Sequence, residues 1–514
     1  MKRKLFRLLP MMVAAALFMV SCSSSDEGTF IPKEVTSVCH IDVASLWEKG
    51  DLSNANSLQM VKGLRQQLKA ESPELDQMLE AILKAPSTCG IDFKQPVCYF
   101  AEAVNSEYWW LTYDVISAKM DSRSKFDQFI DNLAKNCGEE LKHNDTLDMT
   151  VFYFTDDMLV AYNDDRLFLI YDPSNIFNDD IEPVSEIPNG KQYLAKLLNL
   201  KKDESMASNE NFTKYLKERK DLSYFMSYGN IMGISANPMN AIIQRFYGEK
   251  NLEQFKKASV CVYGSFEKGR IEITSKTYGI PEALQKFGAQ KFNEELLAYL
   301  PAQTLAAFTV SIDMKALTEY LGALEDEDFS IDDPLGIKDY TIEDLLNALG
   351  GSMAISFYGF QEGMPYFAAA MDMNDNQLIR DLLNEVAVNN GNVYTFDFFP
   401  MQLVLNDKVA VLSTDPAVIA NAQAGGKSNG LMTVADKARK GNYFYMDLNL
   451  EDWPTELLAL IGFDNNPIVS SIFAMLDRME AETVNGQDGK ACIYLTSDKD
   501  NSLAYILQEV DKMM

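Results

Sequence analysis

The sequence predicts an α+β fold made of two similar units in tandem, each an antiparallel sheet with helices packed mainly on one face. Three observations predict it. Strand-like segments occur as hairpins and do not alternate with helices. Segments of the first half recur, in order, about 240 residues further on. The composition is 47% hydrophobic and 11% aromatic, which is typical of a chain that buries a sizeable core.

The first recurring segment is a strand that leads into a helix. Residues 37–46 read SVCHIDVASL, and residues 308–317 read FTVSIDMKAL. Each has a β-type run ending in Ile-Asp, followed by Asp-x-x-Leu. Because an aspartate before an apolar helix accepts a hydrogen bond from the first turn, Asp42 and Asp313 are predicted to be N-caps.

Two hairpins and a helix follow in both halves. The strand pair at residues 97–115 parallels that at 353–371, and the helical stretch at 125–133 parallels that at 377–383. Residues 158–173 and 401–416 then form a second pair of hairpins. Their turns are predicted at Asn163-Asp164-Asp165 and Asn406-Asp407-Lys408, where Asn and Asp supply turn chemistry. Both hairpins end in Asp-Pro, at Asp172-Pro173 and Asp415-Pro416.

The closing segments give the domain boundaries. Residues 222–227 parallel 442–447, and residues 259–263 parallel 490–494. The sequence therefore predicts a first repeat at 31–280 and a second at 281–514. A helix through Leu284, Phe287, Phe292 and Leu296 is expected to join them.

The N-terminus predicts export. Four cations, at positions 2, 3, 4 and 7, precede an uncharged apolar run from Met11 to Val20. The run is about half the length that a membrane span needs, and it indicates a signal peptide at residues 1–21. Met19-Val20-Ser21-Cys22 resembles a lipobox, so lipidation of Cys22 is expected; ordinary cleavage near Ser21 is the alternative. Residues 22–30 are expected to form a flexible tether.

The net charge of the chain limits the classes of partner that it is expected to bind. The formal net charge is −29, and it becomes −33 once the four signal-peptide cations are removed. A chain this acidic is expected to avoid nucleic acid. The expected partners are the membrane, through lipid on Cys22, and a glycan or an envelope protein.

No catalytic set is recognisable. The chain has two histidines, His40 and His143, and neither belongs to a zinc motif. A Ser–His–Asp triad could still assemble in space, although no G-x-S-x-G elbow supports it. Ser122-Arg-Ser-Lys125 matches S-x-x-K by letter, but a helix cap is the better interpretation. No cofactor motif is present, so no cofactor and no metal site are predicted.

Acidic and aromatic clusters leave alternatives open. Residues 325–328 with Asp332-Asp333, and residues 498–501, could hold Ca²⁺, but they lack the spacing of an EF-hand and are better explained as solvated loops. Trp109-Trp110 could stack on sugars, and core packing is the alternative. Paired carboxylates elsewhere would suffice for a hydrolase.

The remaining cysteines have no recognisable disulfide pattern. Most of them lie in apolar, strand-like runs, where buried free thiols are expected, although a Cys89–Cys98 pair stays open. The six are Cys39, Cys89, Cys98, Cys137, Cys261 and Cys492.

These pieces together resemble a family of uncharacterised Bacteroidetes lipoproteins. The resemblance lies in the lipobox at Cys22, the opening Ile31-Pro32-Lys33-Glu34 with the run Ile41 to Leu46, and the doubled body. It implies an outer-membrane lipoprotein of unknown activity, with Asp26-Glu27 as a weak signal for surface display. We expect a non-enzymatic binding or scaffolding protein. The alternatives are a carboxylate-based envelope hydrolase and an outer-membrane assembly factor.

Overall fold

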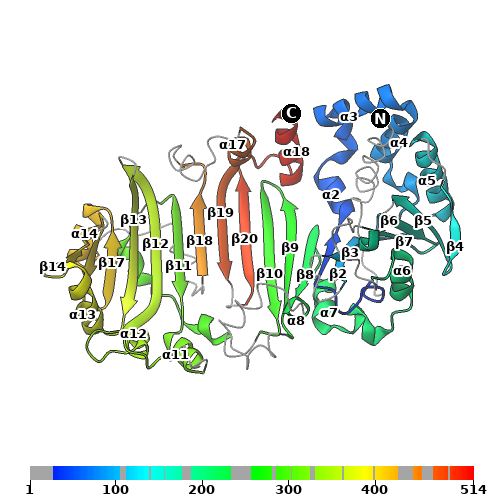
Figure 1. The fold of residues 1–514 in the computed structure, drawn as a ribbon. Coiled ribbons are helices and arrows are strands. Elements are labelled where there is room, and N and C mark those ends of the chain that lie inside the picture. The colour runs from blue at the N-terminus through cyan, green and yellow to red at the C-terminus, as the bar shows by residue number, and fades with distance from the viewer. Residues whose placement is uncertain are drawn as a thin grey trace. The chain divides into compact units, whose positions relative to one another are not determined.

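A computed structural model describes residues 27–104, 111–137, 141–155, 157–175, 187–232, 256–280, 285–302, 304–323, 330–361, 364–396, 400–426, 444–453, 467–483 and 487–513. The chain divides into two compact units (Figure 1). Unit 1 comprises residues 1–271, 277–279 and 498–514, and unit 2 comprises residues 272–276 and 280–497. Each contains a large antiparallel sheet together with helices.

The sheet of unit 1 runs in the order β4-β5-β6-β7-β3-β2-β1-β8-β9, with every neighbouring pair antiparallel. The bounds are β1 (Ser37–Ile41), β2 (Val97–Ala103), β3 (Thr112–Lys119), β4 (Asn144–Thr146), β5 (Met149–Thr155), β6 (Met158–Tyr162), β7 (Arg166–Tyr171), β8 (Leu222–Ser227) and β9 (Ser259–Glu267). Strand β10 (Arg270–Tyr278) follows, and the boundary between the units falls within it.

Helices pack on both faces of this sheet. They are α2 (Val43–Lys49), α3 (Gln59–Glu71), α4 (Pro73–Lys84), α5 (Arg123–Cys137), α6 (Gly190–Leu198), α7 (Glu210–Lys217), α8 (Tyr228–Met232) and α18 (Ser502–Met513). On one face, α3, α4 and α5 pack on strand residues such as Val160. On the other face, α6 and α7 pack on the strand residues that alternate with these, such as Leu159. The prediction that helices lie mainly on one face is therefore wrong for unit 1, because its central strands are apolar on both sides.

The last helix belongs to unit 1. Helix α18 packs on α2, α3 and β9. Its Asp511 carboxylate accepts hydrogen bonds from the backbone N–H groups of Gln59 and Met60, both at 2.8 Å. These are among the first amides of α3, which have no partner inside their own helix. Asp511 therefore caps a helix more than 400 residues earlier in the chain.

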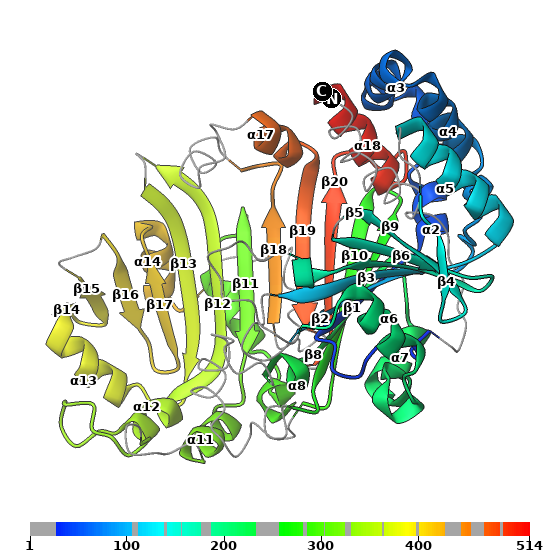
Figure 2. The same cartoon turned by 45° about the vertical axis from the view of Figure 1, so that its right-hand side comes forward.

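The sheet of unit 2 runs in the order β14-β15-β16-β17-β13-β12-β11-β18-β19-β20, again antiparallel throughout. Figure 2 shows these strands in a view turned by 45° about the vertical axis. The bounds are β11 (Ala306–Ser311), β12 (Leu349–Gln361), β13 (Met364–Met373), β14 (Val388–Asn390), β15 (Val393–Thr395), β16 (Gln402–Leu405), β17 (Val409–Ser413), β18 (Phe444–Asn449), β19 (Leu476–Thr483) and β20 (Gly489–Leu495).

The helices of unit 2 are α11 (Met314–Gly322), α12 (Ile342–Ala348), α13 (Gln377–Val386), α14 (Pro416–Gln423) and α17 (Pro467–Phe473). Its main core lies on one face of the sheet, where α14 and the 3₁₀ turn η7 (Glu294–Tyr299) cover Ala354, Ala370 and Tyr445. On the opposite face, α13 covers the β15–β17 end. The predicted joining helix is wrong: its described residues form two short 3₁₀ turns, η6 (Lys286–Ala289) and η7.

The turn chemistry predicted at Asn163 is confirmed, whereas the Asn406 side chain bonds Asn392 and the Ala422 carbonyl outside its own turn. The Asn163 side chain accepts hydrogen bonds from the N–H groups of Asp165 and Arg166, both at 2.9 Å. Asp415 caps α14, which begins at Pro416. Short polar side chains fix these turns because they satisfy backbone donors that no strand or helix can satisfy.

Candidate functional site

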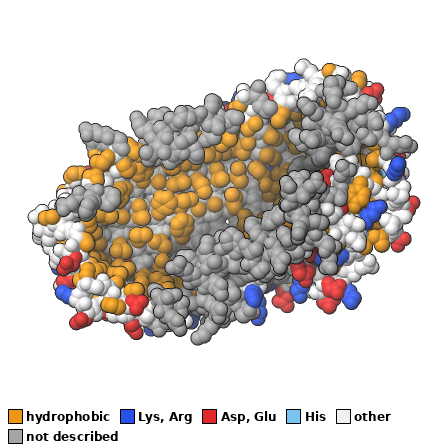
Figure 3. Space-filling model, viewed as in Figure 1, with side chains coloured by type: hydrophobic (Ala, Val, Ile, Leu, Met, Phe, Trp, Pro, Cys, Tyr) orange, Lys and Arg blue, Asp and Glu red, His pale blue; other side chains and the backbone are white. Residues whose placement is uncertain are grey.

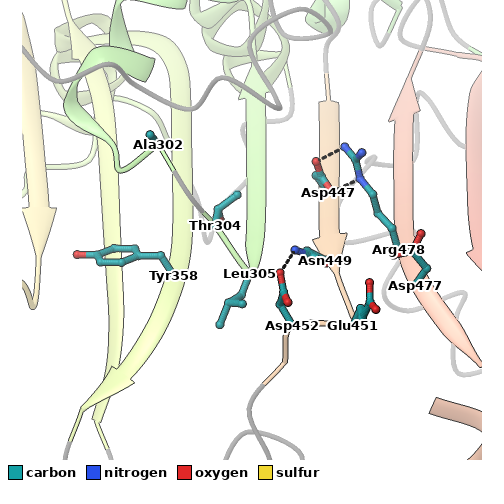
Figure 4. A pocket seen from close by; sticks show the side chains of 10 residues that line it. All are labelled: Ala302, Thr304, Leu305, Tyr358, Asp447, Asn449, Glu451, Asp452, Asp477 and Arg478. Atoms are coloured by element: carbon teal, nitrogen blue, oxygen red, sulfur yellow. Dashed lines mark hydrogen bonds and ion pairs between the residues drawn. The ribbon is translucent and has the colours of Figure 1, made fainter. Parts of the chain in front are cut away.

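A pocket with a volume of about 680 Å³ lies in unit 2. Its lining residues come from the end of β18, the start of β19, the segment that precedes β11 and the second half of β12 (Figure 4). Its lining consists of Ala302, Thr304, Leu305, Tyr358, Asp447, Asn449, Glu451, Asp452, Asp477 and Arg478. Four carboxylates, one guanidinium and one amide thus share a pocket of a size typical for small ligands.

An ion-pair network fixes one side of the pocket. Arg478 donates from Nε to Asp447 Oδ1 at 2.8 Å and from Nη2 to Asp447 Oδ2 at 2.5 Å. The same Nη2 lies 2.8 Å from Glu480 Oε1. The hydrogen bonds with Asp447 raise the pKa of Arg478 above its ordinary value. Figure 4 shows Asp447 and Arg478 facing one another from adjacent strands, and a bidentate pair of this kind holds both side chains in one geometry.

Backbone register brings this network together. Asp447 lies opposite Glu480 across the β18–β19 ladder, so their side chains are on the same face. Tyr494 on β20 donates to Glu480 at 3.3 Å. Burial, with Glu480 nearby, raises the pKa of Tyr494 to about 12. The tyrosine therefore stays protonated and serves as a donor at neutral pH.

The other walls are equally anchored. Asn449 donates to Asp452 at 2.7 Å. Tyr358, which reaches the pocket from β12, donates to Asp415 at 3.0 Å, and the indole N–H of Trp453 donates to the Leu305 carbonyl at 3.0 Å. Within the described residues, Glu451 and Asp477 line the pocket without a hydrogen bond or ion pair to another side chain.

The donor set does not form a metal centre. Among the residues that the structure describes, no group of three or more His, Cys, Asp or Glu side chains could hold a metal ion. What the pocket presents is a set of fixed acceptors and donors. Carboxylates accept, the guanidinium donates, and an amide does both. This chemistry suits a ligand with many hydroxyl groups.

A second surface lies on the opposite face of the same strands. Because successive side chains of a strand point to opposite sides, Met446 and Leu448 point away from the pocket that Asp447 lines. We call this surface the apolar face. Its residues are Phe367, Ala369, Met371, Met353, Ile355, Phe357, Ala306, Phe308, Val310, Phe444, Met446, Leu448, Met479, Ala481, Ala491 and Ile493. Hydrophobic side chains gather there in the space-filling view (Figure 3).

His40, one of the two candidate histidines, lies in the core of unit 1. It is 1% exposed, and its Nδ1 lies 2.9 Å from the hydroxyl of Tyr215. That hydroxyl donates to the Ser223 carbonyl at 2.9 Å, so His40 donates to it. Burial, with Arg219 nearby, holds the pKa of His40 well below 6.5. The arrangement is that of a neutral histidine in a buried hydrogen-bond chain.

The other candidates from the sequence lie apart from the pocket. His143 bonds the exposed carboxylate of Asp131 at 2.9 Å. The Lys125 N–H lies 3.4 Å from Ser122 Oγ at the start of α5, as expected of a cap. Asn501 accepts from the Leu503 N–H at 3.0 Å and donates to the Phe266 carbonyl at 2.8 Å, so it organises a turn.

No disulfide joins Cys39, Cys89, Cys98, Cys261 or Cys492, and all but Cys39 are buried. The alternative of a Cys89–Cys98 disulfide is therefore wrong. Cys98 lies in β2 while Cys89 ends a 3₁₀ turn before it. Burial raises the pKa of the Cys89 thiol to about 11. The side chain of Cys137 lies outside the described residues.

Several predictions fall on residues outside the described ranges, namely the signal peptide 1–21, Cys22, Asp26, Trp109-Trp110 and residues 325–328. The predicted tether at 22–30 is too long at its C-terminal end. Glu27 and Phe30 are 6% exposed, and Glu27 forms an ion pair with Arg219.

The pocket itself was not predicted from the sequence. A weak signal existed at Asp447, a carboxylate between Met446 and Leu448 in a strand-like run, because an acidic residue in an apolar strand indicates a buried partner. Nothing in the sequence pointed to Arg478 as that partner.

Comparison with known proteins places the chain in a family. The model of the family Domain of unknown function (DUF4836) matches residues 28–404, and the chain belongs to that family. No curated protein matches the chain. Crystal form III of TP0453 aligns at 9% identity over 49% of this chain and 80% of its own, with a TM-score of 0.26. Crystal form IV of TP0453 aligns at 8% identity over 48% and 80%, with a TM-score of 0.24.

The helices in the described ranges are short or amphipathic. None of them combines the length and the apolar composition that crossing a bilayer requires.

Proposed function

We propose that this chain is a lipid-anchored envelope protein that binds a glycan in the pocket of unit 2. One observation carries the proposal. The pocket places carboxylate, guanidinium and amide groups around about 680 Å³, and Asp447, Arg478, Asn449 and Asp452 are already held by one another. Side chains fixed in this way form a binding surface that loses little conformational entropy when a ligand arrives.

Glycans fit this chemistry. A sugar hydroxyl is both a donor and an acceptor, and the pocket offers both kinds of partner. The Tyr358 ring adds an apolar wall on which the C–H side of a sugar ring could pack. A nucleic acid or another polyanion does not fit, because four carboxylates line the pocket and the chain carries a net charge of −29.

The direct test is binding of the mature Cys22→Ser chain to a panel of bacterial and host oligosaccharides, followed by calorimetry on any that bind. We expect Asn449→Ala and Asp452→Ala to weaken binding at least tenfold, since each removes one hydrogen-bonding group. Asp407→Ala, in an exposed turn of the same unit, is the matched control and should leave the affinity unchanged. Absence of binding across the panel, or equal loss in the control, would overturn the proposal.

The anchor and the location are part of the proposal and rest on the sequence. Residues 1–21 are removed, Cys22 carries the lipid, and the protein resides at the outer membrane. Metabolic labelling with a radioactive fatty acid should mark the wild-type protein and not Cys22→Ser. Protease shaving of intact cells then separates a surface location from a periplasmic one; protection until the membrane is opened would favour a role in envelope assembly.

We further propose that the two units arose by tandem duplication. The strand orders support it, because β4-β5-β6-β7-β3-β2-β1-β8-β9 and β14-β15-β16-β17-β13-β12-β11-β18-β19 correspond position by position. By this correspondence β9 matches β19. Residues 259–263 lie in β9, whereas residues 490–494, which they resemble in sequence, lie in β20. The sequence match therefore pairs β9 with the strand that follows its structural counterpart β19.

A hydrolase is the second candidate, because several carboxylates line one pocket. Asp447 is engaged at both oxygens by Arg478, and Asp452 accepts a hydrogen bond from Asn449, which leaves Glu451 and Asp477 as the acid–base pair. The two functions differ in outcome. A binding protein returns its glycan intact after long incubation, whereas a hydrolase releases a new reducing end, and Glu451→Gln or Asp477→Asn abolishes that release.

A further inference from the structure

The apolar face of unit 2 is unusual for an antiparallel sheet. Such sheets commonly bury one face in a core and present polar side chains on the other. Here the strands pack on the main core through Ala307, Ala354 and Tyr445, yet their alternate residues are also apolar. The 16 residues named for this face are apolar, and Thr483 on β19 adds a polar side chain at its edge.

Cross-strand register makes this surface continuous. Phe308 on β11 lies opposite Ile355 on β12 and opposite Met446 on β18. Ile355 lies opposite Ala369 on β13, and Met446 lies opposite Ala481 on β19. A row of apolar side chains therefore crosses the strands perpendicular to their direction, and it continues to Ala491 on β20.

The described helices leave the middle of this surface uncovered. Helix α13 packs over the β15–β17 end of the same face. The helix α14 and the turn η7 pack on the opposite face. Phe308, Ile355 and Met446 are half-buried, whereas Ala307, Ala354 and Tyr445 on the core side are fully buried. Figure 3 shows hydrophobic atoms at the surface over β13, β12, β11 and β18.

The area of the apolar face restricts which ligand or partner can cover it. Six strands spaced about 4.8 Å apart, each with two or three same-face residues, give a patch of roughly 400–600 Å². A stable interface between two copies needs about 800 Å² from each partner and a rim of polar contacts. The apolar face falls short of that area and offers no hydrogen bond from its side chains. It suits an occupant that is narrow and needs no hydrogen bonds.

We propose that the apolar face binds the acyl chains of a zwitterionic phospholipid. Hydrocarbon chains bury apolar area and require no polar partner. Methionines such as Met353, Met371 and Met446 adapt to a flexible chain. A free fatty acid would bring a carboxylate for which the described residues of this face supply no cation, and the net charge of −29 disfavours an anionic headgroup. This inference goes beyond the glycan pocket, which lies on the other side of the same strands.

The test uses the mature Cys22→Ser chain, which lacks the proposed lipid of its own, and phosphatidylcholine carrying a pyrene-labelled acyl chain. We expect saturable binding, with affinity weakened at least tenfold by Ile355→Glu and several-fold by the milder Met446→Thr. Val386→Glu is the matched control, because Val386 is 63% exposed on α13 and lies outside the face. Its affinity should equal that of the wild type.

A second measurement locates the lipid. Phosphatidylcholine with a photoreactive acyl chain should crosslink to peptides of β11, β12 and β18, and mass spectrometry identifies them. Three results would overturn the proposal. They are crosslinks outside these strands, tighter binding of the pyrene-labelled fatty acid than of the phospholipid, and no lipid binding at all. A lowered melting temperature of Met446→Thr without lipid binding would show that the chain itself covers this face, or that a second copy does if the protein is dimeric. Glycan binding is measured separately, so failure of one proposal leaves the other intact.

Discussion

Asp42 and Asp313 occupy the same position in their units and make the same hydrogen bond. Asp42 accepts from the Ser45 N–H at 2.8 Å, and Asp313 accepts from the Ala316 N–H at 3.0 Å. Each stands between the first strand of its unit and the following helix. The side chain satisfies a backbone donor that the helix cannot satisfy internally.

Removing either cap should destabilise the protein. We expect Asp42→Ala and Asp313→Ala each to cost about 1 kcal/mol, the usual value for an N-cap aspartate. Urea unfolding of the two variants measures this, with the exposed Asp407→Ala as the control. A midpoint equal to that of the wild type in either cap variant would contradict the assignment.

Two glycines should respond to alanine in opposite directions. Gly63 lies in α3, and a Cβ added there would have no atom within 4 Å, so Gly63→Ala should stabilise by about 1 kcal/mol. Gly90 has a φ of +84°, and a Cβ there would lie 2.5 Å from both Phe126 N and Ser122 O. Gly90→Ala should therefore destabilise by about 2 kcal/mol or more. Thermal melts of the pair decide the signs.

His40 should make the protein less stable in mild acid. Because burial depresses its folded-state pKa, the unfolded chain binds a proton below about pH 6.5 that the folded chain excludes. The stability from neutral His40 is present above that pH and is lost as the pH falls toward the folded pKa. The slope reaches up to about 1.4 kcal/mol per pH unit.

Unfolding between about pH 7 and pH 5 tests this, because most carboxylates titrate at lower pH. The nearby groups are Tyr215, Arg219 and Glu27, whose Oε2 lies 3.7 Å from His40 Nε2. His40→Gln removes the titration and should flatten the profile. An unchanged slope would assign the pH dependence to one of the other groups.

The thiols should be inert in the folded protein. In a Cys22→Ser, Cys137→Ser background, the remaining five cysteines are those that no disulfide joins. Burial raises the pKa values of Cys39, Cys89, Cys98 and Cys492, so little thiolate forms near neutral pH. We expect negligible reaction with a disulfide reagent at about pH 8, and reaction of all five after unfolding. Fewer than five would reveal a disulfide.

Local chemistry was the part of the fold that the sequence predicted well. The caps at Asp42 and Asp313, the Asn163 turn and the Asp415-Pro416 helix start are confirmed, because each depends on hydrogen bonds within a few residues. Helix packing on both faces of unit 1 was missed. Continuous apolar strands such as β6 are compatible with a helix on either side, and periodicity alone does not say how many.

The pocket could not be predicted for a related reason. Its ion pair joins Asp447 to Arg478, residues 31 apart that meet only when β18 and β19 are in register. The apolar face has the same origin. Phe308, Ile355 and Met446 read as ordinary core residues in sequence, and only the position of η7 and α14 on the other side distinguishes them.

The bond from Asp511 to the start of α3 makes unit 1 discontinuous in the chain, with nearly all of unit 2 inserted before its final helix. Synthesis proceeds from the N-terminus, so α18 is still missing when residue 280 emerges. Gln59 and Met60 of α3 gain the Asp511 cap only after more than two hundred further residues have been made. Completion of the fold is thereby tied to completion of the polypeptide, and a chain interrupted anywhere in unit 2 would leave both halves unfinished.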